Sequence, residues 1–562
     1  MKEMKKKIIT MAFAAAAGLF PVFAGPAYPG IERVTLPDGS EISLRQVGDE
    51  HHHFIQTEDG CPVMKGADGF YYYMELDSTG ALCQGNVRVG SPQAASYLKT
   101  ADFAPVFEAL TLEGTDVRTK RYAKRRDRYG VEAFPLEGEV RTIVILVEYQ
   151  DMKFKSPTVR QDFDDMLNSE GYSREGACGS AAEWFAINSD GRFKPTFDVY
   201  GPVTLDNPVY YYGSGTNDPN AYKMVVEGCQ KLDGEIDFSK YDFDNDGFVD
   251  NVFVFYAGYG EHLGSQYAET VWPHSWDIYN IVKLQLDGKY INHYACTSEL
   301  EKHSKMTGMG AFVHEFSHVM GLRDHYSTVY NGAFTPGEWD VMDEGEYNND
   351  GHTPPLYSLF ELYSLGWVEP REIGLEPENV TLRTIDTKDG CIITTGNPNE
   401  FFMLENRQQI GWDEYLPYHG MLIWHIDYNP TDWARNSVNN DPNHGRVDIV
   451  EADGTQSTAT RRGDCWPGNR RKTEFTDETI PAMQTWAGKK LSKPITEITE
   501  NEDGSISFKI LGGVEDAGVD GIVEEGDGNV RYFNLQGVEV LNPEKGQILI
   551  KRNGAKVEKV II

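Results

Sequence analysis

The sequence has little positive charge for its length. Over 562 residues, Lys and Arg number 52 against 87 Asp and Glu, which gives a formal net charge of −35. A surface of this sign repels nucleic acid, so we expect no nucleic-acid partner. Acidic and basic side chains are equal in number up to residue 130, and the excess of acidic residues therefore lies beyond it.

Cysteine is also scarce. The seven cysteines are widely separated, and no two of them form a C-x-x-C pair. Their spacing does not reveal a disulfide connectivity, and an odd count leaves at least one thiol free or bridged to another chain.

Long hydrophobic runs are absent except at the amino terminus. Four lysines among the first seven residues precede an apolar run from Ile8 to Ala24, which ends in Val-Phe-Ala and is followed by Gly25. This order predicts a secretory signal peptide over residues 1–24, cleaved after Ala24. Because no later run is long enough to cross a bilayer, we expect no stable membrane span. The expected location is secreted, either extracellular or attached to the cell surface.

The strongest positive signal is the stretch His314-Glu-Phe-Ser-His-Val-Met-Gly-Leu-Arg-Asp324. On a helix, His314 and His318 lie one turn apart on the same face, so both imidazoles can reach one zinc ion. Glu315 is rotated to the side, where it can accept a proton from a metal-bound water without being a ligand. The spacing therefore predicts a zinc peptidase site with Glu315 as its general base.

A third ligand is expected shortly after this helix. Gly321 permits a left-handed residue at the helix end, so that the chain can reverse and return Asp324 to the metal. Two histidines and one carboxylate leave a coordination position open for water. A one-residue shift would present His325 instead; we favour Asp324 because its spacing is that of the metzincin pattern. Met342, in a turn-rich segment, has the position of a metzincin Met-turn.

These residues resemble the M6 family of secreted metallopeptidases, the immune inhibitor A type, whose pattern is H-E-x-x-H-x-x-G-x-x-D. The similarity extends from about residue 139 to about residue 511 and includes the segments 140–149, 271–276, 363–367, 402–407 and 419–427. The sequence departs from the family at Arg323, where proline is usual, and at Ser327, where an acidic residue is usual. Neither is a predicted ligand, but we expect the turn before the third ligand to be less rigid.

A second group of potential ligands lies between residues 242 and 250. Its spacing matches the first nine positions of a calcium loop, with the ligands Asp242, Asp244, Asp246, the carbonyl of Phe248, and Asp250. The twelfth position, a glutamate in an EF-hand, is Phe253 in an apolar run that predicts a buried strand. We therefore predict a structural calcium site that is not an EF-hand, since unneutralised carboxylates would repel one another. A polar turn without an ion is the alternative.

A basic stretch at residues 118–128 precedes the first predicted catalytic strand near Val140. Exposed, mobile basic segments are easily cut by trypsin-like enzymes, so we expect a zymogen with a propeptide over residues 25–130. An ordinary interdomain linker is the alternative. Cys61 could cap the zinc of a latent enzyme, but the residues around it do not match the usual switch motif. We expect the propeptide to block the site sterically.

The predicted fold class is multidomain. The resemblance implies an α+β, metzincin-like zinc peptidase domain over residues 131–370. Short alternating runs then predict a β-rich accessory domain over 371–512 and a small β-module over 513–562. The last module resembles the carboxy-terminal sorting domains of type IX secretion substrates, which implies secretion machinery as a partner. A plain β-sandwich cap is the alternative.

The sequence thus predicts a secreted zinc endopeptidase that hydrolyses peptide bonds in protein or peptide substrates. Tyr326 and Tyr347 are both candidates for donating a hydrogen bond to the oxyanion. The alternative is a surface adhesion or binding protein with a degenerate peptidase domain, against which the complete ligand set and Glu315 argue.

Overall fold

The computed structural model describes residues 25–49, 52–110, 134–213, 218–301, 304–329, 333–514, 530–534, 537–553 and 556–562. Within these ranges the chain forms several β-sheets and a few helices. The predicted signal peptide and the basic stretch 118–128 lie outside the described residues.

The amino-terminal part is an antiparallel meander of six strands in sequence order. Several of its hairpins turn at glycines with positive φ, of which Gly39, Gly60 and Gly69 follow an aspartate. Asp-Gly pairs favour such turns because glycine adopts the left-handed backbone without strain. The elements are β1 (Glu32–Thr35), β2 (Glu41–Gly48), β3 (His53–Thr57), β4 (Pro62–Lys65), β5 (Tyr71–Leu76), β6 (Leu82–Arg88) and the short helix α1 (Ala94–Tyr97).

The central sheet has five strands in the order β10-β13-β9-β7-β8. Four of them are parallel neighbours, and β10 pairs antiparallel with β13 at one edge. The strands predicted near Val140 and around Phe253 are both present and buried. The bounds are β7 (Gly138–Glu148), β8 (Phe193–Thr204), β9 (Val252–Tyr259), β10 (His274–Asp277) and β13 (His293–Leu300).

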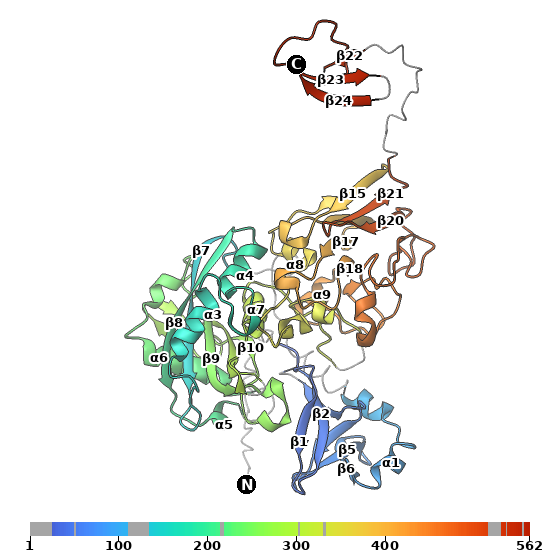
Figure 1. Ribbon diagram of the computed structural model, residues 1–562. Helices are drawn as coiled ribbons and strands as arrows, with labels where there is room; N and C mark the ends of the chain where they lie inside the picture. The colour runs from blue at the N-terminus through green and yellow to red at the C-terminus, as the bar shows by residue number, and fades with distance from the viewer. Residues whose placement is uncertain are drawn as a thin grey trace, which may run out of the picture.

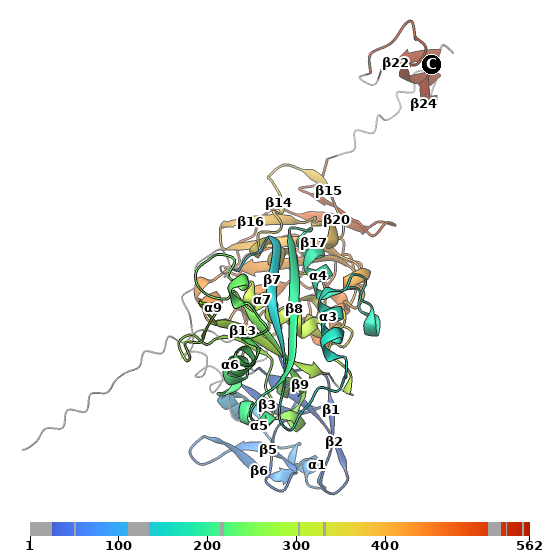
Figure 2. The ribbon, with the colours of Figure 1, turned by 90° about the vertical axis from the view of Figure 1, so that its left-hand side faces the viewer.

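Helices cover both faces of this sheet, as Figure 2 shows. Along β7, Val144 and Leu146 point into one hydrophobic core, whereas Ile143 and Ile145 point into the other. Continuous apolar runs of this kind are typical of parallel strands that are buried on both faces. The first core contains residues of α3 (Val159–Asn168), α4 (Ala181–Asn188) and α7 (Gly310–Val319); the second contains residues of α5 (Val209–Tyr212) and α6 (Ala221–Leu232).

The part after helix α8 (Leu359–Ser364) is β-rich, as the sequence predicts. Its two sheets have the orders β14-β16-β17-β18-β19 and β15-β21-β20. The first core continues into this part, because Trp412, Trp424 and Trp433 belong to it. The elements are β14 (Arg371–Glu372), β15 (Glu378–Leu382), β16 (Cys391–Asn397), β17 (Glu400–Arg407), β18 (Gly420–Asp427), α9 (Pro430–Ala434), β19 (Val447–Ile449), β20 (Ile495–Glu500) and β21 (Ile506–Ile510).

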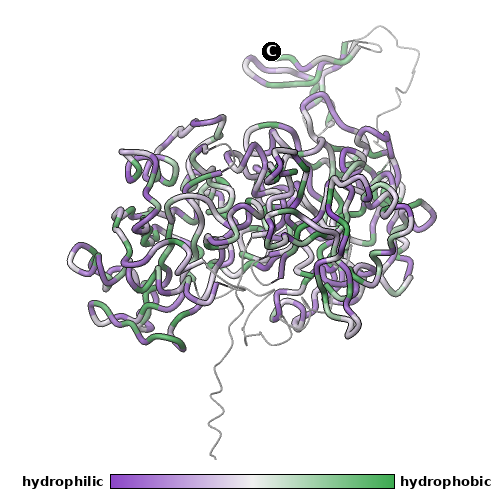
Figure 3. Tube along the Cα trace, turned by 90° about the horizontal axis from the view of Figure 1, so that it is seen from below, coloured by the Kyte–Doolittle hydropathy of each residue, from purple (hydrophilic) through white to green (hydrophobic). Residues whose placement is uncertain are grey.

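The carboxy-terminal residues form a three-stranded antiparallel sheet of β22 (Val530–Phe533), β23 (Ile548–Asn553) and β24 (Lys556–Ile561). Figure 1 shows it apart from the other sheets. Hydrophobic and hydrophilic stretches alternate along the chain (Figure 3), and none of the helices in the described ranges is long and apolar enough to cross a membrane. All seven cysteines are described, and each of them is free.

Candidate active site

Helix α7 carries the three predicted residues of the zinc motif. Phe312 and Phe316 stack on each other at 5.8 Å on the sheet side of the helix, and Phe312 also lies 4.5 Å from Phe253 of β9. All ten helix residues are buried, including His314 and His318. The face that carries the histidines is therefore covered by other segments of the chain.

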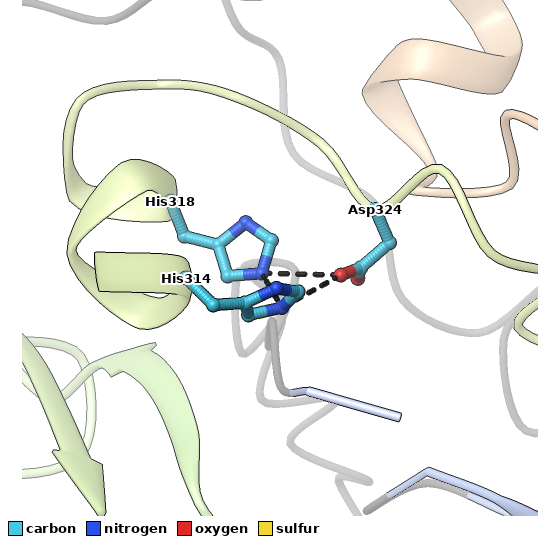
Figure 4. Close-up of side chains that lie close together, drawn as sticks. All are labelled: His314, His318 and Asp324. Atoms are coloured by element: carbon cyan, nitrogen blue, oxygen red, sulfur yellow. Dashed lines mark hydrogen bonds and ion pairs between the residues drawn. The ribbon is translucent and has the colours of Figure 1, made fainter. Parts of the chain in front are cut away.

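The predicted metal ligands converge on one point, as Figure 4 shows. The Nε2 atoms of His314 and His318 are 3.2 Å apart, and Asp324 Oδ1 lies 3.3 Å from the first and 3.2 Å from the second. Ligands at about 2.0–2.1 Å from a tetrahedral zinc ion are roughly 3.3 Å from one another, so the three atoms fit its coordination shell. Asp324 Oδ1 is buried, and its polar neighbours are the two imidazole nitrogens, as expected of a ligand atom.

Local backbone contacts orient these ligands. His314 Nδ1 lies 2.8 Å from the carbonyl oxygen of Val341, and His318 Nδ1 lies 3.0 Å from that of Leu322. Donation from Nδ1 leaves the Nε2 lone pair of each ring facing the other ligands. Burial lowers the pKa of His318 to about 4, which keeps that imidazole neutral.

The chain reverses after the helix as predicted, because Gly321 has a φ of 103°. Burial alone would raise the pKa of Asp324, but the neighbouring imidazoles hold it below its usual range. His325, the competing ligand, points elsewhere: its Nδ1 lies 2.7 Å from Asp340 Oδ2. The structure thus brings His314, His318 and Asp324 together and leaves His325 outside their cluster.

Met342 lies in the buried turn beyond the cluster. Its side chain belongs to the same hydrophobic core as α7, and its carbonyl oxygen accepts a hydrogen bond from His325 N at 2.8 Å. The preceding residue, Val341, accepts the bond from His314. This turn therefore contacts the ligand-bearing segments on both sides of the site.

Glu315 is fully buried beside the cluster and is contacted by the start of the amino-terminal part. The backbone N–H of Gly25 donates to Glu315 Oε1 at 2.8 Å, while Oε2 has no hydrogen-bond partner. Burial raises the pKa of Glu315 well above its ordinary value; His314 opposes this effect and Glu346 adds to it. A Cβ atom on Gly25 would lie 2.5 Å from Glu346 Oε1, so glycine fits here where a larger residue would displace that carboxylate.

The same segment makes further contacts across the site. Trp272 Nε1 donates to the carbonyl oxygen of Gly25 at 3.1 Å, and the Tyr347 hydroxyl donates to that of Pro26 at 2.6 Å. Tyr28 N donates to the carbonyl oxygen of His262 at 3.0 Å. The main chain of residues 25–28 therefore lies against Glu315, Trp272 and Tyr347.

The two candidate tyrosines differ in position. Tyr347 already donates to a peptide carbonyl one residue from the contact with Glu315. Tyr326 lines a cavity of about 290 Å³ together with Pro26 and Ser327. The Tyr347 hydroxyl is therefore placed to donate to a peptide carbonyl next to the segment that contacts Glu315.

The predicted calcium loop precedes β9. Carboxylate oxygens of Asp242, Asp244 and Asp250 lie within 4.8 Å of one another, whereas the Asp246 carboxylate accepts from Phe248 N at 2.8 Å and is outside that group. Burial raises the pKa of Asp250 to about 7, and the negative charges of Asp244 and Asp242 add to this rise.

A cation beside this loop was not predicted from the sequence. Lys289, from the hairpin of β11 (Gln285–Leu286) and β12 (Lys289–Tyr290), forms an ion pair with Asp242. Part of the charge on the loop is therefore neutralised by the chain itself, a contact that no local pattern around residue 242 indicates.

Cys61 and His53 lie away from the cluster. Cys61 N donates to Thr57 Oγ1 at 3.1 Å in the turn between β3 and β4, and its thiol is not among the groups that gather at the histidines. Of the three consecutive histidines, His51 lies outside the described residues. His53 stacks on Trp272 at 4.7 Å and pairs with Glu261 at 3.3 Å, so it joins the amino-terminal sheet to the central part.

The chain is similar to known metallopeptidases. The family described as immune inhibitor A peptidase M6, catalytic domain, matches residues 137–358. The chain is 22% identical over 319 residues to the pre-pro-metalloprotease PrtV of Vibrio cholerae, covering 46% of this chain and 35% of that protein. It is 26% identical over 274 residues to immune inhibitor A of Bacillus thuringiensis subsp. alesti, covering 39% of each.

A third relative, from Arthroderma benhamiae, has a name that contains the words secreted metallopeptidase; it is 22% identical over 359 residues, covering 48% of this chain and 52% of the relative. The matched parts are thus no more than about half the length of these relatives. The matched domain contains both histidines, Glu315, Asp324 and Met342. Residues 137–358 therefore match the catalytic domain of the peptidase M6 family, and the relatives support a metallopeptidase.

Proposed function

We propose that the chain is an exported, zinc-dependent endopeptidase that is made as a latent precursor. The observation that carries this proposal is the convergence of His314 Nε2, His318 Nε2 and Asp324 Oδ1 at 3.2–3.3 Å, beside the Glu315 carboxylate. Two imidazoles and one carboxylate suit zinc and leave a position open for water. Zinc bound there would supply Lewis acidity to the scissile carbonyl and lower the pKa of water.

Glu315 is the proposed general base. It holds the proton of the attacking water and then donates it to the leaving amine nitrogen. Its carboxylate lies next to the cluster, and its Oε2 is unpartnered. We assign the oxyanion donor to Tyr347 rather than Tyr326, because the Tyr347 hydroxyl already donates to the carbonyl of Pro26, one residue from the contact with Glu315.

Latency follows from the position of residues 25–28. While this segment lies against Glu315 and Tyr347, a substrate peptide cannot reach either group. Cleavage within 118–128 would separate residues 25–130 from the enzyme and allow the segment to leave. The proposed block is steric, and Cys61 has no part in it.

We also propose roles for the acidic loop at residues 242–250 and for the carboxy-terminal module. Calcium would bind Asp242, Asp244, Asp246, the carbonyl of Phe248 and Asp250, with Lys289 displaced from its ion pair. The carboxy-terminal module would be the part that secretion machinery recognises.

The deciding experiment measures zinc content and casein hydrolysis of the activated enzyme and of Asp324→Ala and His325→Ala. We expect stoichiometric zinc and activity in the parent, sharp loss of zinc in Asp324→Ala, and little change in His325→Ala. The reverse ranking would move the third ligand to His325. A folded parent without zinc or hydrolysis would favour the adhesion alternative.

A further inference from the structure

We propose that Asn436, in the β-rich accessory part, is a positioning residue for the metal ligand Asp324, so that this part completes the metal centre. The inference rests on the proposed zinc site and gives the accessory part a role that its sequence does not indicate. Asn436 lies 112 positions from Asp324 and beyond the peptidase M6 match, which ends at residue 358.

The two side chains form a paired contact. Asp324 N donates to Asn436 Oδ1 at 3.0 Å, and Asn436 Nδ2 donates to Asp324 Oδ2. Both residues are almost completely buried, at 1% and 2% exposure. Because Oδ2 accepts from the amide, Oδ1 is the oxygen that faces the imidazoles of His314 and His318. One asparagine thus fixes both the backbone and the carboxylate orientation of the ligand.

The backbone at Asn436 explains how an asparagine reaches this position. Helix α9 begins at Pro430, capped by the Asn429 side chain, which accepts from Thr431 N at 2.9 Å. Two residues after the helix ends, Asn436 has a φ of 53°, and its N–H donates to the carbonyl oxygen of Trp433 at 3.2 Å. Asparagine tolerates the left-handed region better than most residues with a side chain. The reversal turns its amide toward Asp324.

Two further hydrogen bonds hold the residues on either side of Asp324 against the segment around Asn436. Arg323 Nε donates to the carbonyl oxygen of Trp433 at 2.9 Å, and Asn439 Nδ2 donates to that of His325 at 2.6 Å. Arg323, which replaces the usual proline of the family, is therefore anchored by the accessory part. The sequence-based expectation of a less rigid turn did not include this anchor, because it joins residues far apart in the chain.

Residues that orient a metal ligand typically change metal affinity by about 10- to 100-fold when they are replaced. Asn436→Gly removes both contacts to Asp324 and keeps a residue that adopts positive φ without strain. We therefore expect zinc affinity to fall by about 10- to 100-fold in this variant.

The test is a double-mutant cycle in the full chain, with zinc affinity measured by competition with a chromogenic chelator. The variants are Asn436→Gly, Asp324→Ala and the two together. If Asn436 acts through Asp324, its replacement should lower zinc affinity in the parent and have no further effect in the Asp324→Ala background. Cobalt-substituted protein gives a second readout, since Asn436→Gly should alter its visible spectrum when the carboxylate reorients.

Asn440→Ala is the matched control. Asn440 anchors the same loop at Thr328, whose N–H donates to Asn440 Oδ1 at 2.8 Å, but Thr328 is not a ligand. We expect Asn440→Ala to lower the melting temperature without changing zinc affinity. An equal loss of affinity in Asn440→Ala and Asn436→Gly would overturn the specific role of Asn436.

The remaining outcomes separate this inference from the function it rests on. Equal effects of Asn436→Gly in both backgrounds would make its role structural and refute the proposal. Unchanged zinc affinity in Asp324→Ala would instead refute the metal site itself. If Asn436→Gly shows no cooperative thermal transition, Asn436→Asp takes its place in the cycle, since aspartate also tolerates positive φ and keeps the acceptor for Asp324 N. Additive effects of that variant would equally refute the proposal.

Discussion

The contact between residues 25–28 and the proposed catalytic groups predicts how strongly the proposed precursor is inhibited. Four hydrogen bonds join this segment to the site: from Gly25 N to Glu315, from Trp272 to the Gly25 carbonyl, from Tyr347 to the Pro26 carbonyl, and from Tyr28 N to the His262 carbonyl. At a net value of about 1 kcal/mol each, they hold the segment in place by about 4 kcal/mol. Since about 1.4 kcal/mol corresponds to a factor of ten, kcat/KM of the precursor should be roughly 1,000-fold below that of the activated enzyme.

The assay compares precursors whose basic residues within 118–128 are replaced by glutamine, so that activation by cleavage cannot occur. Hydrolysis of a quenched fluorescent peptide should be barely detectable in the chain that begins at Gly25. It should rise by roughly 1,000-fold when residues 25–28 are deleted and residues 29–130 are kept. Cys61→Ser should leave the intact precursor inactive, because its thiol takes no part in the block.

Two results would refute this reasoning. Full activity of the intact, uncleavable precursor would mean that residues 25–28 do not block the cleft. The precursor without residues 25–28 could also stay inactive while residues 131–562 alone are active. This result would mean that the six-stranded sheet, and not residues 25–28, excludes substrate.

Three other predictions concern the base, the acidic loop and a buried carboxyl. Glu315→Gln should keep zinc and the melting temperature while kcat falls by about 10²- to 10⁴-fold, because the amide cannot take a proton; stoichiometric zinc with undiminished turnover would contradict the role. Calcium removal with zinc retained should lower the melting temperature and hasten autolysis. Asp244→Ala combined with Asp246→Ala should abolish this response, and a double variant that still responds to calcium removal would place the ion elsewhere. Lys289→Met should tighten calcium binding by removing a competing ammonium. Burial raises the pKa of Asp464 to about 8, so its contribution to stability is complete below about pH 4 and is lost as the pH rises through 8. Asp464→Asn should therefore melt at a higher temperature than the parent at about pH 9 but not at about pH 4. An equal increase in melting temperature at both pH values would show that titration of Asp464 is not the cause.

The parts of the site that are close in sequence could be predicted from it. His314, Glu315 and His318 are placed by the helical repeat, and Gly321 supplies the positive φ that the chain reversal needs. The buried strand β9 was also predictable, because its residues are continuously apolar. In these cases local geometry alone brings the relevant atoms together.

Contacts between distant segments could not be predicted in this way. Gly25 meets Glu315 across 290 positions, and Asn436 meets Asp324 across 112. A single glycine or asparagine in a loop has no periodicity, so its sequence neighbourhood carries no sign of the partner. Lys289 is similar, since it meets Asp242 across 47 positions.

The seven unpaired cysteines determine how this protein can be handled. Burial raises the pKa of Cys229 to about 12 and that of Cys391 to about 11, so almost none of either side chain is thiolate at neutral pH. Cys178 is the exposed thiol and should react first with maleimides, which makes it a site for a fluorescent label on an otherwise unmodified chain.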